Sequence, residues 1–172
     1  MRPVLSRVES VYLIPSSIEV DFSSSKATNA WIEANPDLIG KQDEYGRLPI
    51  HIACTDRNAS FEAILLLYKA YPGAIRVGDR NGNIPLHYAC IAGHSLQVIQ
   101  ALLSYCMDTV SVKDKDGRIA LHYAYIYSSL TVISKILESY HGAAQMSDKY
   151  GNKPSYYISF NRSNNESSRR AL

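Results

Sequence analysis

Residues 79–90 read Asp79-Arg-Asn-Gly82-Asn-Ile-Pro85-Leu-His87-Tyr-Ala89-Cys90, and this segment decides how the chain folds because it recurs. Related copies begin at Asp43, Asp114 and Asp148, and their glycines follow one another at intervals of 36, 35 and 34 residues. In each copy Asp and Gly are typical of a tight turn. Pro, present in all copies but the third, is typical of the first position of a helix. A period of this length predicts a row of similar helical units.

A second helix is expected a few residues after the first in each of the first three copies. In the middle copy, Val98, Ile99, Leu102 and Leu103 share one face of such a helix, which predicts that this face is buried. The serines that precede these helices are expected to be N-caps: Ser60, Ser95 and Ser129. The same spacing predicts one more second helix over residues 24–35, where Trp31 and Ile32 would cover the open end of the row.

At these residues the chain resembles the ankyrin repeat family, whose pattern joins an Asp-x-x-Gly turn to Thr-Pro-Leu-His-x-Ala and two short antiparallel helices. The resemblance implies an all-α solenoid, in which stacked helix-turn-helix repeats are joined by β-turn or hairpin loops. The ankyrin-repeat domain is expected over residues 24–158, with a half repeat at 24–42, full repeats at 43–78, 79–113 and 114–147, and a capping half repeat at 148–158. Residues 1–23 are expected to form a partly ordered N-terminal segment and residues 159–172 a disordered tail.

The chain departs from the family pattern at the threonine, which is replaced by Leu48, Ile84, Ile119 and Lys153. Loss of the threonine hydroxyl predicts helix caps that are weaker by about 1 kcal/mol each. The second halves of the repeats are also longer than in the family, around residues 71–73 and 140–142. The aromatic residues are mostly tyrosine, with 13 Tyr against 3 Phe and 1 Trp. Because a buried Tyr hydroxyl needs a partner, half-buried positions are expected for them.

Histidine and cysteine invite a metal or disulfide interpretation, which the repeat spacing disfavours. His51, His87 and His122 occupy one repeat position, and stacked helices lie about 8–10 Å apart, too far for these rings to share an ion. Each imidazole is therefore expected to bond the backbone near its own turn. By the same spacing Cys54 and Cys90 are expected to be buried packing residues, and Cys106 to be partly exposed. No metal and no cofactor are predicted.

Composition and motifs narrow the function. The net charge of +2 argues against a strong nucleic-acid binder, and the chain has no nucleotide-binding, hydrolase or kinase motif, so no enzyme and no small-molecule substrate are predicted. The stretch without charges at residues 81–107 is too polar and too interrupted to enter a membrane, and the apolar run at residues 11–15 is too short for a signal peptide. With an odd number of cysteines, an intracellular location is expected, in the cytoplasm or the nucleus.

The resemblance to ankyrin proteins implies a protein partner that contacts the turn tips and the inward face of the first helices. The corresponding positions are Glu44, Tyr45, Arg47, Thr55, Asp56, Arg80, Asn81, Asn83, Tyr88, Ile91, Lys115, Asp116, Arg118, Tyr123, Ile126, Tyr127, Lys149, Tyr150 and Asn152. One alternative is a regulatory or targeting arm that acts on an enzyme supplied in trans. A weaker alternative is nucleic-acid binding through a basic edge made of Arg47, Arg80, Lys115, Arg118, Lys149 and Lys153.

Overall fold

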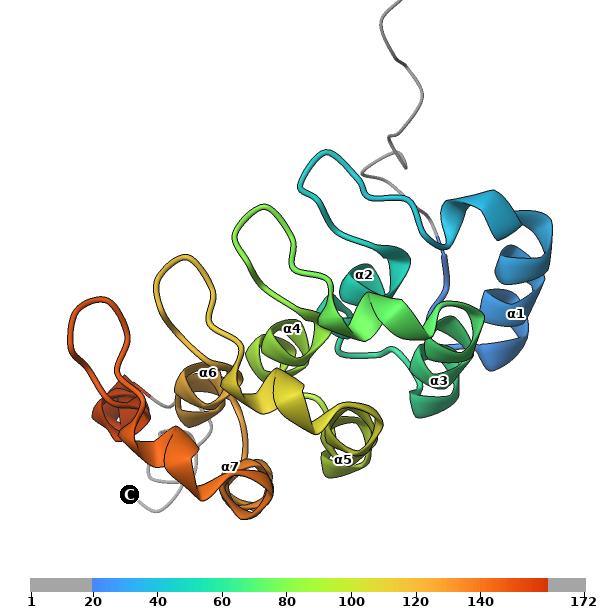
Figure 1. The fold of residues 1–172 in the computed structure, drawn as a ribbon. Coiled ribbons are helices and arrows are strands. Elements are labelled where there is room, and N and C mark those ends of the chain that lie inside the picture. Colours follow the sequence, from blue (N-terminus) through green and yellow to red (C-terminus); the bar gives the residue numbers. More distant parts are fainter. Residues whose placement is uncertain (1–19, 161–172) are drawn as a thin grey trace, which may run out of the picture.

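The structure, a computed structural model, describes residues 20–160, so the predicted N-terminal segment up to residue 19 and the predicted tail from residue 161 lie outside it. Within the described range the chain forms a curved row of short helices (Figure 1). The first helices of the repeats are α2 (Pro49–Thr55), α4 (Pro85–Ala92) and α6 (Ala120–Tyr127). The second helices are α1 (Ser25–Ala34), α3 (Phe61–Ala70), α5 (Leu96–Tyr105) and α7 (Leu130–Ser139). The 3-10 helices are η1 (Pro36–Leu38), η2 (Pro72–Arg76), η3 (Met107–Ser111), η4 (His141–Gln145) and η5 (Pro154–Phe160).

The helices form two layers. One layer stacks α2 on α4, α4 on α6 and α6 on η5, while the other stacks α1 on α3 and α5 on α7. The turns before the first helices all project from the same side of the row (Figure 1). The ankyrin solenoid expected from the sequence is therefore the observed architecture.

Three of the four residues that replace the family's threonine belong to the core, and the fourth, Lys153, is exposed. Leu48, Ile84 and Ile119 are each no more than 1 % exposed, and none of them makes a side-chain cap bond. The histidine three residues later partly compensates, because its Nδ1 accepts the backbone N–H of the N-cap residue at 3.0–3.1 Å. These helices thus begin with an apolar contact and an imidazole acceptor in place of a hydroxyl.

The second helices start where the serines predict, but the caps differ. Ser60 Oγ accepts the N–H of Ala63 at 3.1 Å. Ser95 and Ser129 are N-caps by position and make no side-chain cap bond, so the predicted bond is wrong at these two helices. The Ser129 hydroxyl instead forms a hydrogen bond with the hydroxyl of Thr131. The helix expected over residues 24–35 is α1, and its Trp31 and Ile32 pack half-buried against the core.

The extra residues of the longer repeats form 3-10 turns after the second helices. The Tyr140 ring lies so close over Gly142 that a Cβ there would stand 2.7 Å from Cζ of the ring. Cys54 and Cys90 are fully buried, as expected, and burial raises the pKa of Cys90 to about 12. The expectation that Cys106 is partly exposed is wrong, because it is only 4 % exposed and its Sγ accepts a bond from Arg76 Nε at 3.0 Å.

Candidate functional site

The turn of each repeat is built around its aspartate. In the second repeat, Asp79 Oδ1 accepts the backbone N–H groups of Asn81 and Asn83, both at 2.8 Å. Gly82 closes the turn with φ of 79°, a conformation that side chains with a Cβ rarely adopt. The aspartates of the other three copies accept the same pair of backbone bonds: Asp43, Asp114 and Asp148. The sequence prediction for these turns is confirmed.

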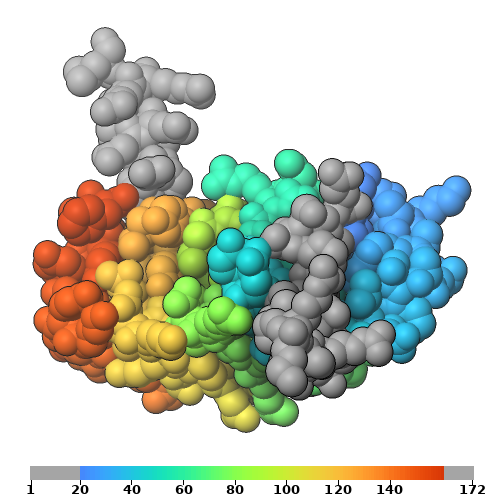
Figure 2. All heavy atoms as spheres, turned by 90° about the horizontal axis from the view of Figure 1, so that it is seen from above, coloured from blue at the N-terminus to red at the C-terminus, as the bar shows by residue number. Residues whose placement is uncertain are grey.

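Backbone hydrogen bonds tie neighbouring turn tips together. The donors are the N–H groups of Arg80, Lys115 and Lys149, and the acceptors are the carbonyls of Tyr45, Asn81 and Asp116, at 2.8–2.9 Å. Each bond links a tip to the tip of the preceding repeat. Four tips that are separated in sequence therefore form one connected row, which Figure 2 shows from above in chain order.

Two of the three repeated histidines also join successive repeats. Since Nδ1 accepts a backbone N–H, the proton lies on Nε2, which donates to a backbone carbonyl. His87 Nε2 bonds Arg118 O and His122 Nε2 bonds Asn152 O of the next repeat, each at 3.2 Å. His51 Nε2 instead bonds Val77 O near the end of its own repeat at 2.8 Å. Burial lowers the pKa of His87 to about 4, so the ring is neutral at neutral pH. The expected bond near the histidine's own turn is confirmed, and the bond to the next repeat is an addition that the sequence did not indicate.

In three of the four copies, a tyrosine nine residues after the aspartate bonds its carboxylate and closes the turn. The hydroxyls of Tyr88 and Tyr157 donate to the second carboxylate oxygen of Asp79 and Asp148, each at 2.6 Å, and Tyr123 donates to its aspartate in the same way. The expected half-burial holds for Tyr88 and Tyr123 and is wrong for Tyr157, which is 8 % exposed. Tyr157 belongs to η5, and its ring packs against the rings of His122, Tyr156 and Phe160. The sequence interpretation missed this pairing of Asp with Tyr, although the constant interval of nine residues between them could have indicated it.

The first repeat replaces this tyrosine with Ile52 and satisfies its aspartate differently. Arg47 Nε donates to Asp43 Oδ2 at 2.8 Å, and the Arg47 guanidinium forms an ion pair with the same carboxylate. The guanidinium also lies 4.9 Å from the centre of the Tyr45 ring. In every copy, therefore, the second carboxylate oxygen of the turn aspartate accepts a bond from a side chain.

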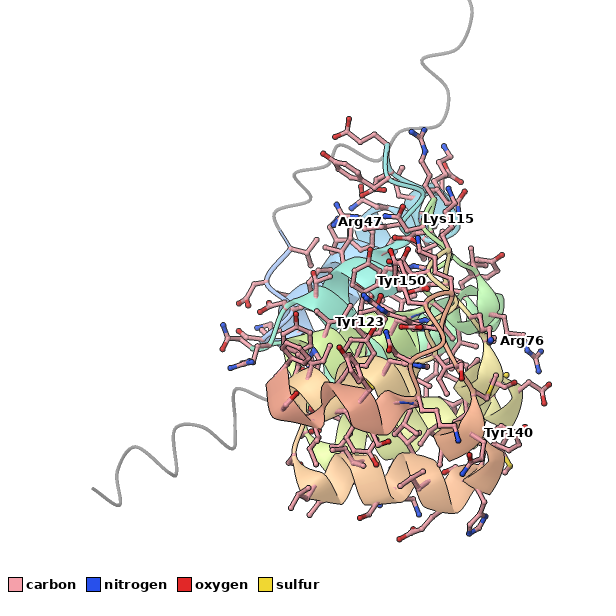
Figure 3. The ribbon with its side chains drawn as sticks, turned by 90° about the vertical axis from the view of Figure 1, so that its left-hand side faces the viewer. Arg47, Arg76, Lys115, Tyr123, Tyr140 and Tyr150 are labelled. Carbon is pink, nitrogen blue, oxygen red and sulfur yellow. The ribbon has the colours of Figure 1, made fainter. Side chains whose placement is uncertain are left out.

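The positions predicted to contact a partner all retain accessible surface. Exposed among them are Glu44, Tyr45, Thr55, Arg80, Asn81, Lys115, Lys149 and Tyr150. Partly exposed are Arg47, Asp56, Asn83, Tyr88, Ile91, Asp116, Arg118, Tyr123, Ile126, Tyr127 and Asn152. Figure 3 shows Lys115, Tyr123 and Tyr150 over the turns and first helices, while Arg76 and Tyr140 lie toward the other edge.

Several cations of the basic edge already have side-chain partners within the protein. Lys149 Nζ pairs with Asp116 Oδ1, and Lys153 Nζ donates to the Gln145 side chain at 2.6 Å. The ion pair raises the pKa of Lys149 and lowers the pKa of Asp116. Two exposed cations of the edge, Arg80 and Lys115, have no acidic side chain within ion-pair distance in the described part of the chain. The edge is therefore a row of mixed charges.

A family model described as ankyrin repeats (3 copies) matches residues 21–111 and 50–149, which together span most of the chain. The chain belongs to the ankyrin repeat family. A comparison with curated protein sequences finds no significant match. The ankyrin architecture accounts for the Asp-x-x-Gly turns, the buried histidines and the paired helices described above.

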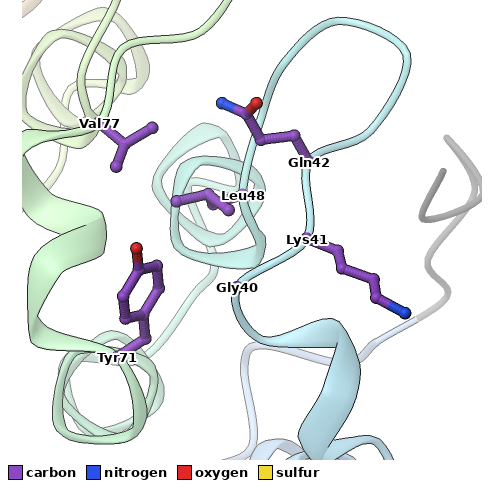
Figure 4. Close-up of a pocket in the computed structure, with 6 residues that line it drawn as sticks. All are labelled: Gly40, Lys41, Gln42, Leu48, Tyr71 and Val77. Carbon is purple, nitrogen blue, oxygen red and sulfur yellow. The ribbon is translucent and has the colours of Figure 1, made fainter. Parts of the chain in front are cut away.

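Several hollows mark the surface of the ankyrin stack. One of about 440 Å³ lies between the first turn and the end of α3, away from the predicted contact positions (Figure 4). It is lined by Gly40, Lys41, Gln42, Leu48, Tyr71 and Val77. A polar hollow of about 200 Å³ lies between two turn tips and is lined by Asn81, Asn83, Asp114, Lys115, Asp116 and Tyr123. A further hollow, of about 310 Å³, is apolar and is lined by Ile126, Tyr127, Tyr157 and Phe160, so it includes two of the predicted contact residues.

Two further observations bear on chemistry within residues 20–160. No group of three or more His, Cys, Asp or Glu side chains in this range is arranged to hold a metal ion. Nor does any helix in it combine the length and apolar character needed to cross a membrane.

Proposed function

We propose that this ankyrin chain is a non-catalytic protein-binding module whose turn tips and first helices form the contact surface. Ankyrin repeats are in general protein–protein interaction modules, and the family is generally non-catalytic. What remains specific to this chain is which surface it uses and what the partner is.

The observation that carries the proposal is the rigidity of the turn row together with the exposure of its side chains. Each turn is fixed by an aspartate and each neighbouring pair of tips by a backbone bond. Side chains held on a fixed frame lose less conformational entropy on binding than side chains on free loops. Tyr and Arg, which recur along this row, are also the residues most enriched at interface hot spots.

A pull-down with matched surface variants tests the assignment. In the contact-face variant, Tyr45, Arg80 and Tyr127 are replaced by alanine. In the control variant, Tyr71, Arg76 and Tyr140 on the opposite side are replaced by alanine, so both lose two tyrosines and one arginine. Circular dichroism of both variants checks that they remain folded.

The proposal predicts that wild type and the control variant capture the same proteins by crosslinking and mass spectrometry, while the contact-face variant loses them. Loss of capture in the control variant alone would reject this surface. The identity of the captured proteins also tests the alternative of a regulatory arm, which requires that one enzyme is present in every complex.

The mixed charges weigh against nucleic-acid binding as the main role. Phosphate binding is driven by unpaired cations, whereas Arg47 and Lys149 are held by Asp43 and Asp116 in this edge. A duplex-binding assay at low and high salt is expected to show no salt-sensitive association.

A further inference from the structure

At the C-terminal end of the contact surface, an arginine lacks close ionic partners. Arg118 lies 3.9 Å from the nearest carboxylate oxygens of both Asp116 and Asp148, at the outer limit of an ion pair. Its closest hydrogen bond runs from a terminal nitrogen to the Tyr157 hydroxyl at 3.3 Å. Its Nε is buried and has no hydrogen-bond partner among the described residues. An arginine carries five N–H donors, and this side chain is 23 % exposed, so the donors of its terminal nitrogens can reach a partner at the surface.

The carboxylates nearest to Arg118 already accept bonds from other groups, which explains why they do not form closer ion pairs with this arginine. Asp148 accepts the backbone N–H groups of Tyr150 and Asn152 and the hydroxyl of Tyr157. Asp116 is engaged by Lys149. The guanidinium is instead held beside two aromatic rings, 5.8 Å from the centre of Tyr123 and 5.2 Å from that of Tyr157.

Tyr157 connects this cation to the apolar hollow. Its hydroxyl bonds Arg118, while its ring lines the hollow together with Ile126, Tyr127 and Phe160. Phe160 is 54 % exposed, so one wall of the hollow faces solvent. The Tyr157 side chain therefore contacts both the Arg118 guanidinium and the apolar hollow.

The neighbouring turn tips add further exposed cations near Arg118. Lys115 and Arg80 are exposed at equivalent positions of adjacent turns, and neither has an acidic side chain within ion-pair distance in residues 20–160. A ligand that fills the hollow lies beside Tyr157 and the Arg118 that bonds it, and one that extends along the tips also passes Lys115 and Arg80. Guanidinium groups favour carboxylates, with which they form paired hydrogen bonds.

We propose that the partner presents an acidic peptide segment with one bulky apolar side chain. The apolar side chain enters the hollow beside Tyr127 and Phe160, and an adjacent carboxylate pairs with Arg118. This inference rests on the proposed function and specifies the chemistry of its partner. A peptide fits better than a nucleic acid because the hollow is apolar and because Glu44 and Asp116 interrupt the row of cations.

Fluorescence anisotropy with designed peptides tests the inference. The probes are labelled ten-residue peptides with a central Phe flanked by Glu, the same peptide with Gln for Glu, and the same peptide with Ser for Phe. The Glu–Phe peptide is expected to bind the intact chain at least tenfold more tightly than either of the other two. Equal affinities, or no binding by any probe, would overturn the inference.

Two variants separate the two parts of the site. Arg118→Gln is expected to abolish the preference for Glu over Gln, and Phe160→Ser is expected to abolish the preference for Phe over Ser while leaving the preference for Glu. Arg76→Gln removes an exposed arginine on the opposite side and is expected to change neither. Because Phe160 is exposed, its replacement keeps the test decisive even if Arg118→Gln perturbs the turn.

The result is distinguishable from failure of the proposed function. If protein partners are captured through the contact face but the probes show no preference, only the acidic-peptide inference fails. If nothing is captured by the intact chain, the binding function itself fails. Salt-sensitive binding of a DNA duplex with no discrimination among the peptides would likewise overturn the inference in favour of a nucleic-acid partner.

Discussion

Acidification should destabilise the protein well above the range in which carboxylates titrate, because the repeated histidines are buried in neutral form. Burial lowers the pKa of His87 from 6.5 to about 4. In the unfolded chain the ring takes up a proton near pH 6.5, so the unfolded state binds more protons than the folded state between these values. The contribution of His87 is therefore complete above pH 6.5 and is lost as the pH falls toward 4.

The size of the stability loss follows from the pKa shift of His87. At 1.36 kcal/mol per pKa unit, His87 alone accounts for about 3 kcal/mol over the whole window. Proton linkage gives a loss of about 1.3 kcal/mol between pH 7.5 and pH 5.5 and about 2.5 kcal/mol by pH 4.5. Burial also lowers the pKa of His51 and His122, so both act in the same direction.

Urea unfolding followed by circular dichroism at pH 7.5, 6.5, 5.5 and 4.5 measures this loss. In His87→Asn the amide oxygen can still accept the Ile84 N–H but does not titrate, so the variant should be less stable at pH 7.5 and should depend less on pH. His141→Asn changes an exposed histidine and should keep the wild-type pH profile. If His87→Asn retained the full wild-type loss between pH 6.5 and pH 4.5, the assignment of the effect to His87 would be refuted.

Three further outcomes are expected. Tyr123→Phe removes the donor to buried Asp114 and should lower the free energy of unfolding by about 1–2 kcal/mol in urea titrations; an unchanged midpoint would argue against the pairing. Gly151→Ala should cost about 1 kcal/mol from backbone strain alone, and Gly117→Ala should cost more, because its Cβ would lie 2.9 Å from a backbone nitrogen of the next tip; equal losses would show that the tips are not in close contact. The buried thiol of Cys54, whose pKa burial raises, should react with a thiol reagent only as fast as the chain unfolds, and rapid labelling of native protein would contradict that burial.

The local rules of the repeat were readable from the sequence because they involve residues a few positions apart. Asp79 and Gly82 define their turn by their own chemistry, and Pro85 marks the helix start that follows. These features placed the turns and the starts of the helices correctly. The Asp–Tyr pairing was equally local and could have been found from its constant interval.

What could not be predicted depends on contacts between repeats. The buried Cys106 accepts a bond from Arg76, which lies 30 residues earlier in the chain and in the preceding repeat. The bond from His87 to Arg118 O depends on the close stacking of two turns, which no residue pattern within one repeat records. The incomplete pairing of Arg118 likewise depends on two repeats, because other donors already engage the carboxylates of Asp116 and Asp148.

The contact surface itself is tested most directly by hydrogen–deuterium exchange of the complex with a captured partner. Binding through the proposed face predicts slower exchange at the turn tips and in α2, α4 and α6, with little change in α3, α5 and α7. Protection confined to α3, α5 and α7, with unchanged exchange at the tips, would contradict the account.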